Sequence, residues 1–280
     1  MTIGSHLKAA LSLSLITANL LLWSLPLAVA LAVRLIIPRT RREVARLNSK
    51  IYRYAVVFDD WVLKRIVGAR WADPCLELDR DEVIVVIANH RSWTDVFLVQ
   101  SVIARRGPIV KFLCKKELAY IPLFGLICLA FDFPILQRRA RGHQSESERR
   151  TSDRQRVRDA CKTVYRSPAA MLSFAEGTRY SDEKQRSLKS QYRHLLPPRS
   201  GGFSAMLAAL EPLDPRVVDV TIVYPHQSNF WRFLAGNSGE IQIVASVYST
   251  KTVVERGVES WLEDRWAAKD LVLDRQRVGR

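Results

Sequence analysis

The sequence predicts an α/β fold in which a mixed central sheet is flanked by helices and preceded by a membrane-anchoring helix. Short apolar runs that suit buried strands, such as residues 83–88 and 170–174, alternate with longer segments of helical periodicity. Residues 9–33 carry no formal charge and consist mostly of Leu, Ala, Val and Ile. With 280 residues, the chain is long enough for one large α/β domain after such a segment.

The uncharged segment is long enough to span a hydrocarbon core of roughly 30 Å as a helix. Pro26 would kink this helix without preventing it. A cleaved signal peptide is the competing interpretation, because Ala28, Val29 and Ala30 have the small-residue spacing of a cleavage site. The segment is much longer than the apolar core of ~7–15 residues that signal peptides use, and a basic stretch follows it. We therefore expect residues 1–40 to form a transmembrane or membrane-anchor helix.

Basic residues gather on the carboxyl-terminal side of this segment. Since positively charged loops stay on the cytoplasmic side, we expect residues 41–280 to face the cytoplasm from the cytoplasmic (inner) membrane. The four cysteines form no CxxC pair, and reduced thiols agree with that location. The basic residues next to the segment are Arg34, Arg39, Arg41, Arg42, Arg46 and Lys50.

The formal net charge of +15 indicates an anionic partner, which can be nucleic acid, anionic lipid or a phosphorylated substrate. A nucleic-acid binder leaves the apolar amino-terminal segment unexplained. A protein on the cytoplasmic leaflet explains both features, because each Lys or Arg beside the membrane contributes on the order of 1 kcal/mol toward anionic lipid. We therefore expect the phospholipid bilayer as a partner and no nucleic acid.

The remaining elements follow from periodicity and from Pro, Gly and capping patterns. Residues 118–136 are apolar enough to suggest a second span, but Pro122, Gly125, Asp132 and Pro134 favour a helical turn followed by a buried strand. The other expected elements, in chain order, are a helix over 40–70, a strand over 83–88, a helix from Ser92 to Ala104, a strand over 109–113, a charged loop over 139–154 leading into a helix to about Arg166, strands over 170–174, 219–224 and 241–248, and a carboxy-terminal amphipathic helix over 255–275.

A histidine and a carboxylate follow the first buried strand. His90 and Asp95 stand five positions apart, and the Ser92-x-x-Asp95 spacing is a capping-box pattern that starts a helix there. Asp95 can then bond one ring nitrogen of His90, which leaves the other nitrogen to accept a proton. In an arbitrary HxxxxD sequence, the ordinary interpretation is a first-turn acid and a polar loop histidine. The pair is therefore a candidate catalytic base with its orienting acid.

A second polar motif, Glu176-Gly177-Thr178-Arg179, follows the strand over 170–174. Glycine permits a close approach of the backbone, and an acid with an arginine can position a phosphate or the loop itself. By itself the motif is compatible with an ordinary surface turn.

Together the motifs resemble the glycerophosphate and 1-acylglycerol-3-phosphate acyltransferase family, the PlsC-like lysophospholipid acyltransferases. Residues 89–95 match the HxxxxD box of this family, and residues 174–179 match its Phe-Pro-Glu-Gly-Thr-Arg box with Ala175 in place of the proline. Two further blocks match in the same order over roughly residues 50–250, namely Lys111 to Arg138 with its Pro122-x-x-Gly125, and Val220 to Pro225.

The resemblance implies an acyltransferase of phospholipid biosynthesis and lipid metabolism. It implies a lysophospholipid acceptor, acyl-CoA or acyl carrier protein as the donor co-substrate, and neither a metal nor another cofactor. Ala175 and the carboxy-terminal Trp261 to Asp270 segment favour a subgroup whose acceptor need not be lysophosphatidate. The residues expected to bind substrate are Arg138, Glu176, Gly177, Thr178, Arg179 and Arg199, where Arg199 replaces a phosphate-contacting lysine of the family.

The mechanism expected from these residue types is direct transfer. His90 would take the proton of the acceptor hydroxyl as its oxygen attacks the thioester carbonyl, and Asp95 would orient the imidazole. Arginine side chains would hold the acceptor phosphate, because guanidinium matches phosphate oxygens in a bidentate fashion. Apolar residues between 112 and 136 are candidates for an acyl channel or for ordinary core packing. The alternatives are an acyl-thioester hydrolase and a non-catalytic lipid-binding relative.

Overall fold

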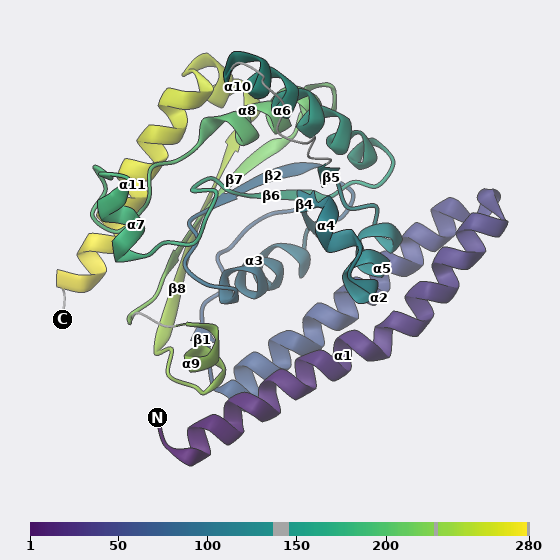
Figure 1. The fold of residues 1–280 in the computed structure, drawn as a ribbon, viewed down its shortest axis with the longest axis horizontal. Helices are drawn as coiled ribbons and strands as arrows, with labels where there is room; N and C mark the ends of the chain where they lie inside the picture. The colour runs from purple at the N-terminus through teal and green to yellow at the C-terminus, as the bar shows by residue number, and fades with distance from the viewer. Residues whose placement is uncertain (137–145, 227–228, 279–280) are drawn as a thin grey trace.

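The centre of the molecule is a six-stranded sheet with the strand order β1-β8-β7-β2-β6-β3 (Figure 1). A computed structural model describes residues 1–136, 146–226 and 229–278. Neighbouring strands pair in parallel except for β7 and β8, so the sheet is mixed, as predicted. The strands are β1 (Arg70–Trp71), β2 (Ile84–Ala88), β3 (Val110–Phe112), β6 (Ala170–Phe174), β7 (Arg216–Val223) and β8 (Glu240–Ser249), with a separate parallel pair of β4 (Cys114–Lys115) and β5 (Ile135–Leu136).

Helices cover both faces of the sheet because the central strand β2 is apolar on both sides. Val85 and Ile87 point into one buried cluster, which α8 and α11 help to form. Ile84, Val86 and Ala88 point into the opposite cluster, which includes side chains of α3. This alternation of period two explains why the run 83–88 is continuously apolar in the sequence.

The helical segments agree in kind with the predicted ones where both are described. The Pro122 segment forms a short helix and then strand β5, as expected. The α-helices are α1 (Ile3–Ile36), α2 (Arg41–Trp61), α3 (Thr94–Ala104), α4 (Lys116–Ala119), α5 (Pro122–Ala130), α6 (Glu146–Cys161), α7 (Asp182–Ser187), α8 (Ser200–Leu210), α9 (Phe230–Leu234), α10 (Thr250–Glu255) and α11 (Val258–Val278), with short 3₁₀ or π segments η1 (Pro38–Thr40), η2 (Val62–Val67), η3 (Lys162–Tyr165) and η4 (Glu211–Leu213).

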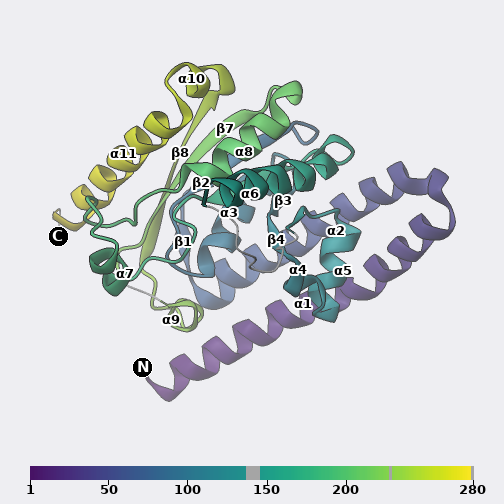
Figure 2. The same ribbon diagram turned by 45° about the horizontal axis from the view of Figure 1, so that its top comes forward.

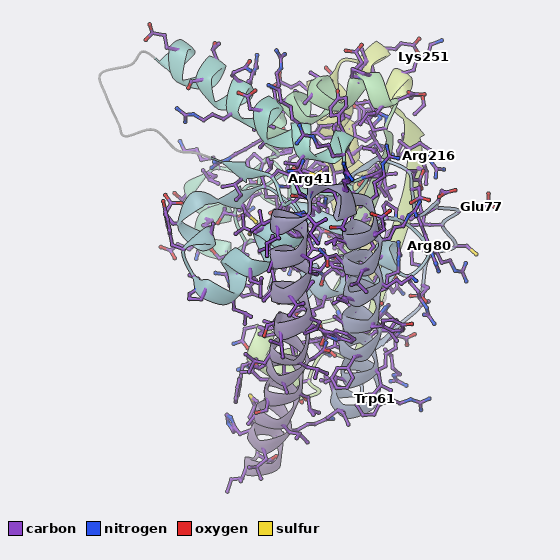
Figure 3. The ribbon with its side chains drawn as sticks, turned by 90° about the vertical axis from the view of Figure 1, so that its right-hand side faces the viewer. Arg41, Trp61, Glu77, Arg80, Arg216 and Lys251 are labelled. Carbon is purple, nitrogen blue, oxygen red and sulfur yellow. The ribbon has the colours of Figure 1, made fainter. Side chains whose placement is uncertain are left out.

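The two amino-terminal helices form an antiparallel pair that projects beyond the sheet (Figure 2). Asn19 on α1 donates to the Ala55 carbonyl oxygen (3.0 Å) and to the Asp59 carboxylate (2.9 Å) on α2. Figure 3 shows Arg41 at the turn of this pair and Trp61 at the opposite end of α2. The amide of Asn19, polar within an apolar helix, therefore fixes how α1 lies on α2.

Helix α1 is long and apolar enough to cross a membrane, judged by length and composition. Only 17% of its most apolar window is buried, so it differs from an ordinary core helix. One side of α1 contacts α2, α5 and α9, and the other side carries exposed leucines such as Leu22 and Leu25.

The carboxy-terminal helix α11 packs on the sheet through one buried face. Trp261, Leu262, Trp266 and Leu273 lie on this face together with a fully buried lysine, Lys269. Such a lysine is stable inside a protein only when its ammonium group is hydrogen-bonded and paired.

Candidate active site

Three neighbouring strands end side by side, and a polar residue follows each of them. Strand β2 lies between β6 and β7 and runs parallel to both. His90, Glu176 and Tyr224 come shortly after these three strands. Because the carboxyl ends of parallel strands lie at one edge of a sheet, these residues meet there.

The backbone of His90 is held from three directions. The preceding Asn89 exchanges two hydrogen bonds with the backbone of Ile222, at 2.9 and 2.8 Å, and so extends the pairing of β2 with β7. The amide of His90 donates to Glu176 Oε1 at 3.0 Å. Its carbonyl oxygen accepts from the amide of Tyr180 at 2.7 Å. The position of His90 is thus fixed before its side chain makes any contact.

The imidazole of His90 is oriented by Asp95 and Phe174. Nδ1 lies 2.8 Å from Asp95 Oδ2, and the ring stacks on Phe174 with centroids 3.9 Å apart. Because a carboxylate only accepts, Nδ1 carries the proton of the neutral ring and Nε2 is left able to take one. The His90 side chain is 16% exposed, against 1% for Asp95, so a substrate can reach the ring.

Asp95 is placed by the start of helix α3. This helix begins at Thr94, two residues later than the predicted start at Ser92. Asp95 Oδ2 accepts from the amides of Arg91 (2.6 Å) and Ser92 (2.9 Å), while the Ser92 hydroxyl accepts from the amide of Thr94 (3.0 Å). The acidic half of the predicted capping box is therefore present, and it directs the carboxylate back toward His90.

Glu176 acts on the protein backbone in this structure. Oε1 accepts from the His90 amide, and Oε2 accepts from the Leu196 amide at 3.2 Å. Burial raises the pKa of this carboxyl to about 7, against the opposing effect of these hydrogen bonds. Glu176 thereby joins the histidine loop to the segment around Leu196.

The rest of the Glu-Gly-Thr-Arg motif forms a tight turn. Gly177 has a φ of +69°, a left-handed conformation that favours glycine, and the Arg199 side chain lies against it. The Thr178 hydroxyl accepts from Lys184 Nζ at 2.7 Å. The guanidinium of Arg179 lies over the ring of Trp93, 5.7 Å from its centroid.

The predicted arginines lie in different places. Arg138 falls outside the described residues. Arg199 lines a hollow of about 520 Å³ together with Arg154 and the first residues of α8. Another hollow of about 370 Å³ opens beside the histidine loop, with Arg91 and Arg232 on its walls. Its remaining lining residues are Tyr180, Ser181, Asp182, Tyr224, His226 and Asn229.

Sequence reasoning missed Arg91, Arg232 and Tyr224 as residues of this region. Tyr224 was predicted only as the end of a strand, although its place after a parallel strand is the same signal that singled out His90 and Glu176. Arg91 lies within the HxxxxD box itself. Within the described parts of the chain, no group of three or more His, Cys, Asp or Glu side chains is arranged to hold a metal ion.

Comparison with known protein families gives a match over residues 76–225 to the family model described as Acyltransferase. The matched segment runs from before β2 to just after β7 and includes all three strand ends.

Curated relatives carry related names. The chain is 28% identical over 208 residues to "Probable 1-acyl-sn-glycerol-3-phosphate acyltransferase 5" of Arabidopsis thaliana, covering 69% of this chain and 53% of that protein. It is 25% identical over 252 residues to "Lysophosphatidylinositol acyltransferase 10" of Caenorhabditis elegans, covering 83% of this chain and 62% of that protein. The matched part thus spans between 53% and 62% of the length of these two relatives.

A solved structure has a similar fold. The crystal structure of the 1-acyl-sn-glycerophosphate acyltransferase PlsC from Thermotoga maritima superimposes with a TM-score of 0.51 and 15% sequence identity. The match covers 91% of this chain and 98% of that one.

Proposed function

Because this chain belongs to the acyltransferase family, we propose that it transfers a fatty acyl group from an acyl thioester to the hydroxyl of a 1-acyl lysophospholipid. The observation that carries this proposal is the His90–Asp95 pair at the edge where β2, β6 and β7 end, beside a hollow whose walls include Arg91 and Arg232. The names of the relatives agree with a glycerophospholipid acceptor.

In the proposed reaction, Nε2 of His90 takes the proton from the acceptor hydroxyl as its oxygen attacks the thioester carbonyl carbon. Asp95 holds the ring and stabilises the imidazolium that forms. Collapse of the tetrahedral intermediate breaks the carbon–sulfur bond, and the imidazolium returns the proton to the departing thiolate. The new ester bond forms directly, with no acyl-enzyme.

The acceptor phosphate is assigned to arginines at the edge of the site. Arg91 and Arg232 border the hollow beside Tyr224, and Arg179 directly precedes Tyr180 on its wall. Arg138 and Arg199 remain candidates from the family resemblance, and Arg199 lines the other hollow with Arg154. Guanidinium groups suit the role because they bind phosphate oxygens in pairs.

We propose further that the bare apolar side of α1 lies in lipid at the cytoplasmic (inner) membrane, with the α/β domain in the cytoplasm. Ile3, Leu7, Leu22 and Leu25 are each more than half exposed, which is costly in water and favourable in a bilayer. At the amino-terminal end of α1, Nδ1 of His6 accepts a hydrogen bond from the indole Nε1 of Trp231 on α9 at 3.1 Å. Because α9 also supplies Arg232, this end of α1 brings the membrane near the hollow, and a lysolipid can enter from the leaflet.

The test measures thiol release from oleoyl-CoA and from oleoyl acyl carrier protein, with and without each member of a panel of 1-oleoyl lysophospholipids that includes lysophosphatidate and lysophosphatidylinositol, in mixed vesicles. We expect acceptor-dependent release with at least one donor. Acceptor-independent release would identify a thioesterase, and no release with bound lipid would identify a lipid-binding relative.

His90→Ala is the first variant to assay. We expect it to lower kcat about 10²- to 10⁴-fold, the usual contribution of a positioned general base, while binding of the acyl thioester persists. Thermal unfolding of the variant in the same detergent is the control for folding. A variant that keeps half of the wild-type rate would remove His90 from the mechanism.

A further inference from the structure

Tyr224 forms a hydrogen bond with the carboxylate of Asp95. Its hydroxyl lies 2.5 Å from Asp95 Oδ1, the carboxylate oxygen that does not face His90. The side chain comes from the end of β7, 129 positions away from Asp95 in the sequence. The contact is thus made by the pairing of strands and cannot come from the local helix start.

The two oxygens of Asp95 have separate partners. Oδ2 receives the His90 ring and two backbone amides, so its position is fixed by the loop and by α3. Oδ1 receives the Tyr224 hydroxyl. A fully buried carboxylate is costly unless both oxygens are hydrogen-bonded, so the hydroxyl supports the ionised form of Asp95.

The direction of this hydrogen bond follows from the surroundings of Tyr224. Burial, and next the nearby charge of Asp95, raise the pKa of Tyr224 well above its ordinary value, so the hydroxyl keeps its proton. Thr94 lies near enough to Tyr224 to oppose this rise of its pKa, and the Ser92 hydroxyl donates to Thr94 Oγ1 at 2.8 Å. The Tyr224 hydroxyl is therefore the donor to Asp95 Oδ1, because a carboxylate can only accept.

We propose that Tyr224 is a positioning residue that acts on the reaction through Asp95. By binding Oδ1, its hydroxyl holds the carboxylate in the orientation that meets Nδ1 of His90. The charged groups around this pair are Arg91 on the same loop and Glu176 from the end of β6, whose carboxylate accepts from the His90 amide. This inference rests on the proposed function and adds a residue to it.

The test is Tyr224→Phe in the full-length protein, assayed with oleoyl-CoA and 1-oleoyl lysophosphatidate. Losing a hydrogen bond to a charged group is expected to lower kcat about 10- to 100-fold, with little change in the acceptor KM. The acid limb of the kcat/KM profile should also move to higher pH. Without the tyrosine donor the carboxylate holds more negative charge, so the His90–Asp95 pair binds a proton more readily.

A double-mutant cycle separates this role from simple loss of structure. In the Asp95→Asn background, Tyr224→Phe should cost much less than in the wild type, because the group through which it acts is already removed. The matched control is Tyr52→Phe, which also removes a buried tyrosine hydroxyl but leaves the site intact, since its partners are the Val110 backbone and the Gln100 side chain. It should lower Tm without moving the pH profile.

Two results would overturn the proposal while leaving the acyltransferase function in place. One is a Tyr224→Phe enzyme with wild-type kcat and pH profile, or with a change confined to the acceptor KM. The other is an equal cost of the substitution in both backgrounds. If Tyr224→Phe does not fold, Thr94→Val replaces it and should shift the acid limb in the same direction by a smaller amount. An unshifted acid limb in that variant would reject the role of Tyr224, whereas the absence of acceptor-dependent thiol release by the wild type would reject the proposed function itself.

Discussion

At the residue scale, the pairing of His90 with Asp95 arises from the short loop of residues 89–93, which joins strand β2 to helix α3. The backbone amides of Arg91 and Ser92 bind Asp95 Oδ2, and this local geometry brings the carboxylate back to the imidazole. All of these contacts span five residues or fewer. For that reason the pairing could be predicted from the sequence once the HxxxxD box was recognised together with the other motifs, whereas the spacing alone also fits a first-turn acid and a polar loop histidine.

Glu176 provides a prediction about pH at the same scale. Burial raises the pKa of its carboxyl from 4.5 to about 7, so the folded protein binds this proton more tightly than the unfolded chain. The resulting stabilisation of the folded protein is complete at pH values below the unfolded-state pKa of 4.5, and it is lost as the pH rises through about 7. We therefore expect the Tm of Glu176→Gln to fall less than the Tm of the wild type as the pH rises from about 4.5 to about 7.

Thermal unfolding across a pH series measures this difference. Glu183→Gln is the matched control, because Glu183 is exposed on α7 and should leave the pH dependence of Tm unchanged. Parallel curves for the wild type and Glu176→Gln would contradict the prediction.

At the element scale, helix α11 holds the segment that supports Glu176. The Asp270 carboxylate accepts from the amides of Arg193 and His194, each at 2.8 Å. The same segment supplies the Leu196 amide to Glu176 and the His194 carbonyl to Arg91. The carboxy-terminal helix therefore supports the active-site loops as well as covering the core.

Lys269 fixes α11 to the sheet and gives a stability prediction. Its ammonium group, fully buried, donates to the Val220 carbonyl oxygen at 2.6 Å and forms an ion pair with Asp219. Lys269→Met leaves Asp219 buried without its countercharge, and should lower the free energy of unfolding by about 3–5 kcal/mol.

Urea denaturation in detergent checks this value. Lys251→Met is the comparison, because Lys251 is 82% exposed and its loss should change stability by no more than ~0.5 kcal/mol. Equal effects of the two substitutions would show that the buried lysine contributes nothing specific.

At the scale of the whole molecule, positive charge and bare apolar surface occur together. The net charge is +15, and exposed arginines lie around the turn between α1 and α2, where Figure 3 shows Arg41. The apolar side of α1 continues from that turn. We therefore expect both forces to contribute to vesicle binding, with different dependence on salt.

Vesicle flotation separates the two contributions. Preference for phosphatidylglycerol over phosphatidylcholine vesicles should fall between ~0.1 and ~1 M salt, because the Debye length falls from about 10 to about 3 Å. The double variant Leu22→Glu with Leu25→Glu should bind weakly to both vesicles, whereas Leu271→Glu, an exposed leucine on α11, should bind as the wild type does. A salt-independent preference would reject the electrostatic part, and a fully bound double variant would reject the role of α1.

The sequence by itself determined the features that depend on short-range order: the apolar helix, the alternation of strands and helices, and the His90–Asp95 spacing. The tertiary structure alone decided the partners of Glu176, Tyr224 and Lys269. Each of these contacts joins residues separated by 20 or more positions, and they exist because β2 lies between β6 and β7 while α11 packs on β7. Which strands become neighbours is settled by burying both faces of one sheet at once, and local patterns in a single sequence do not specify that order.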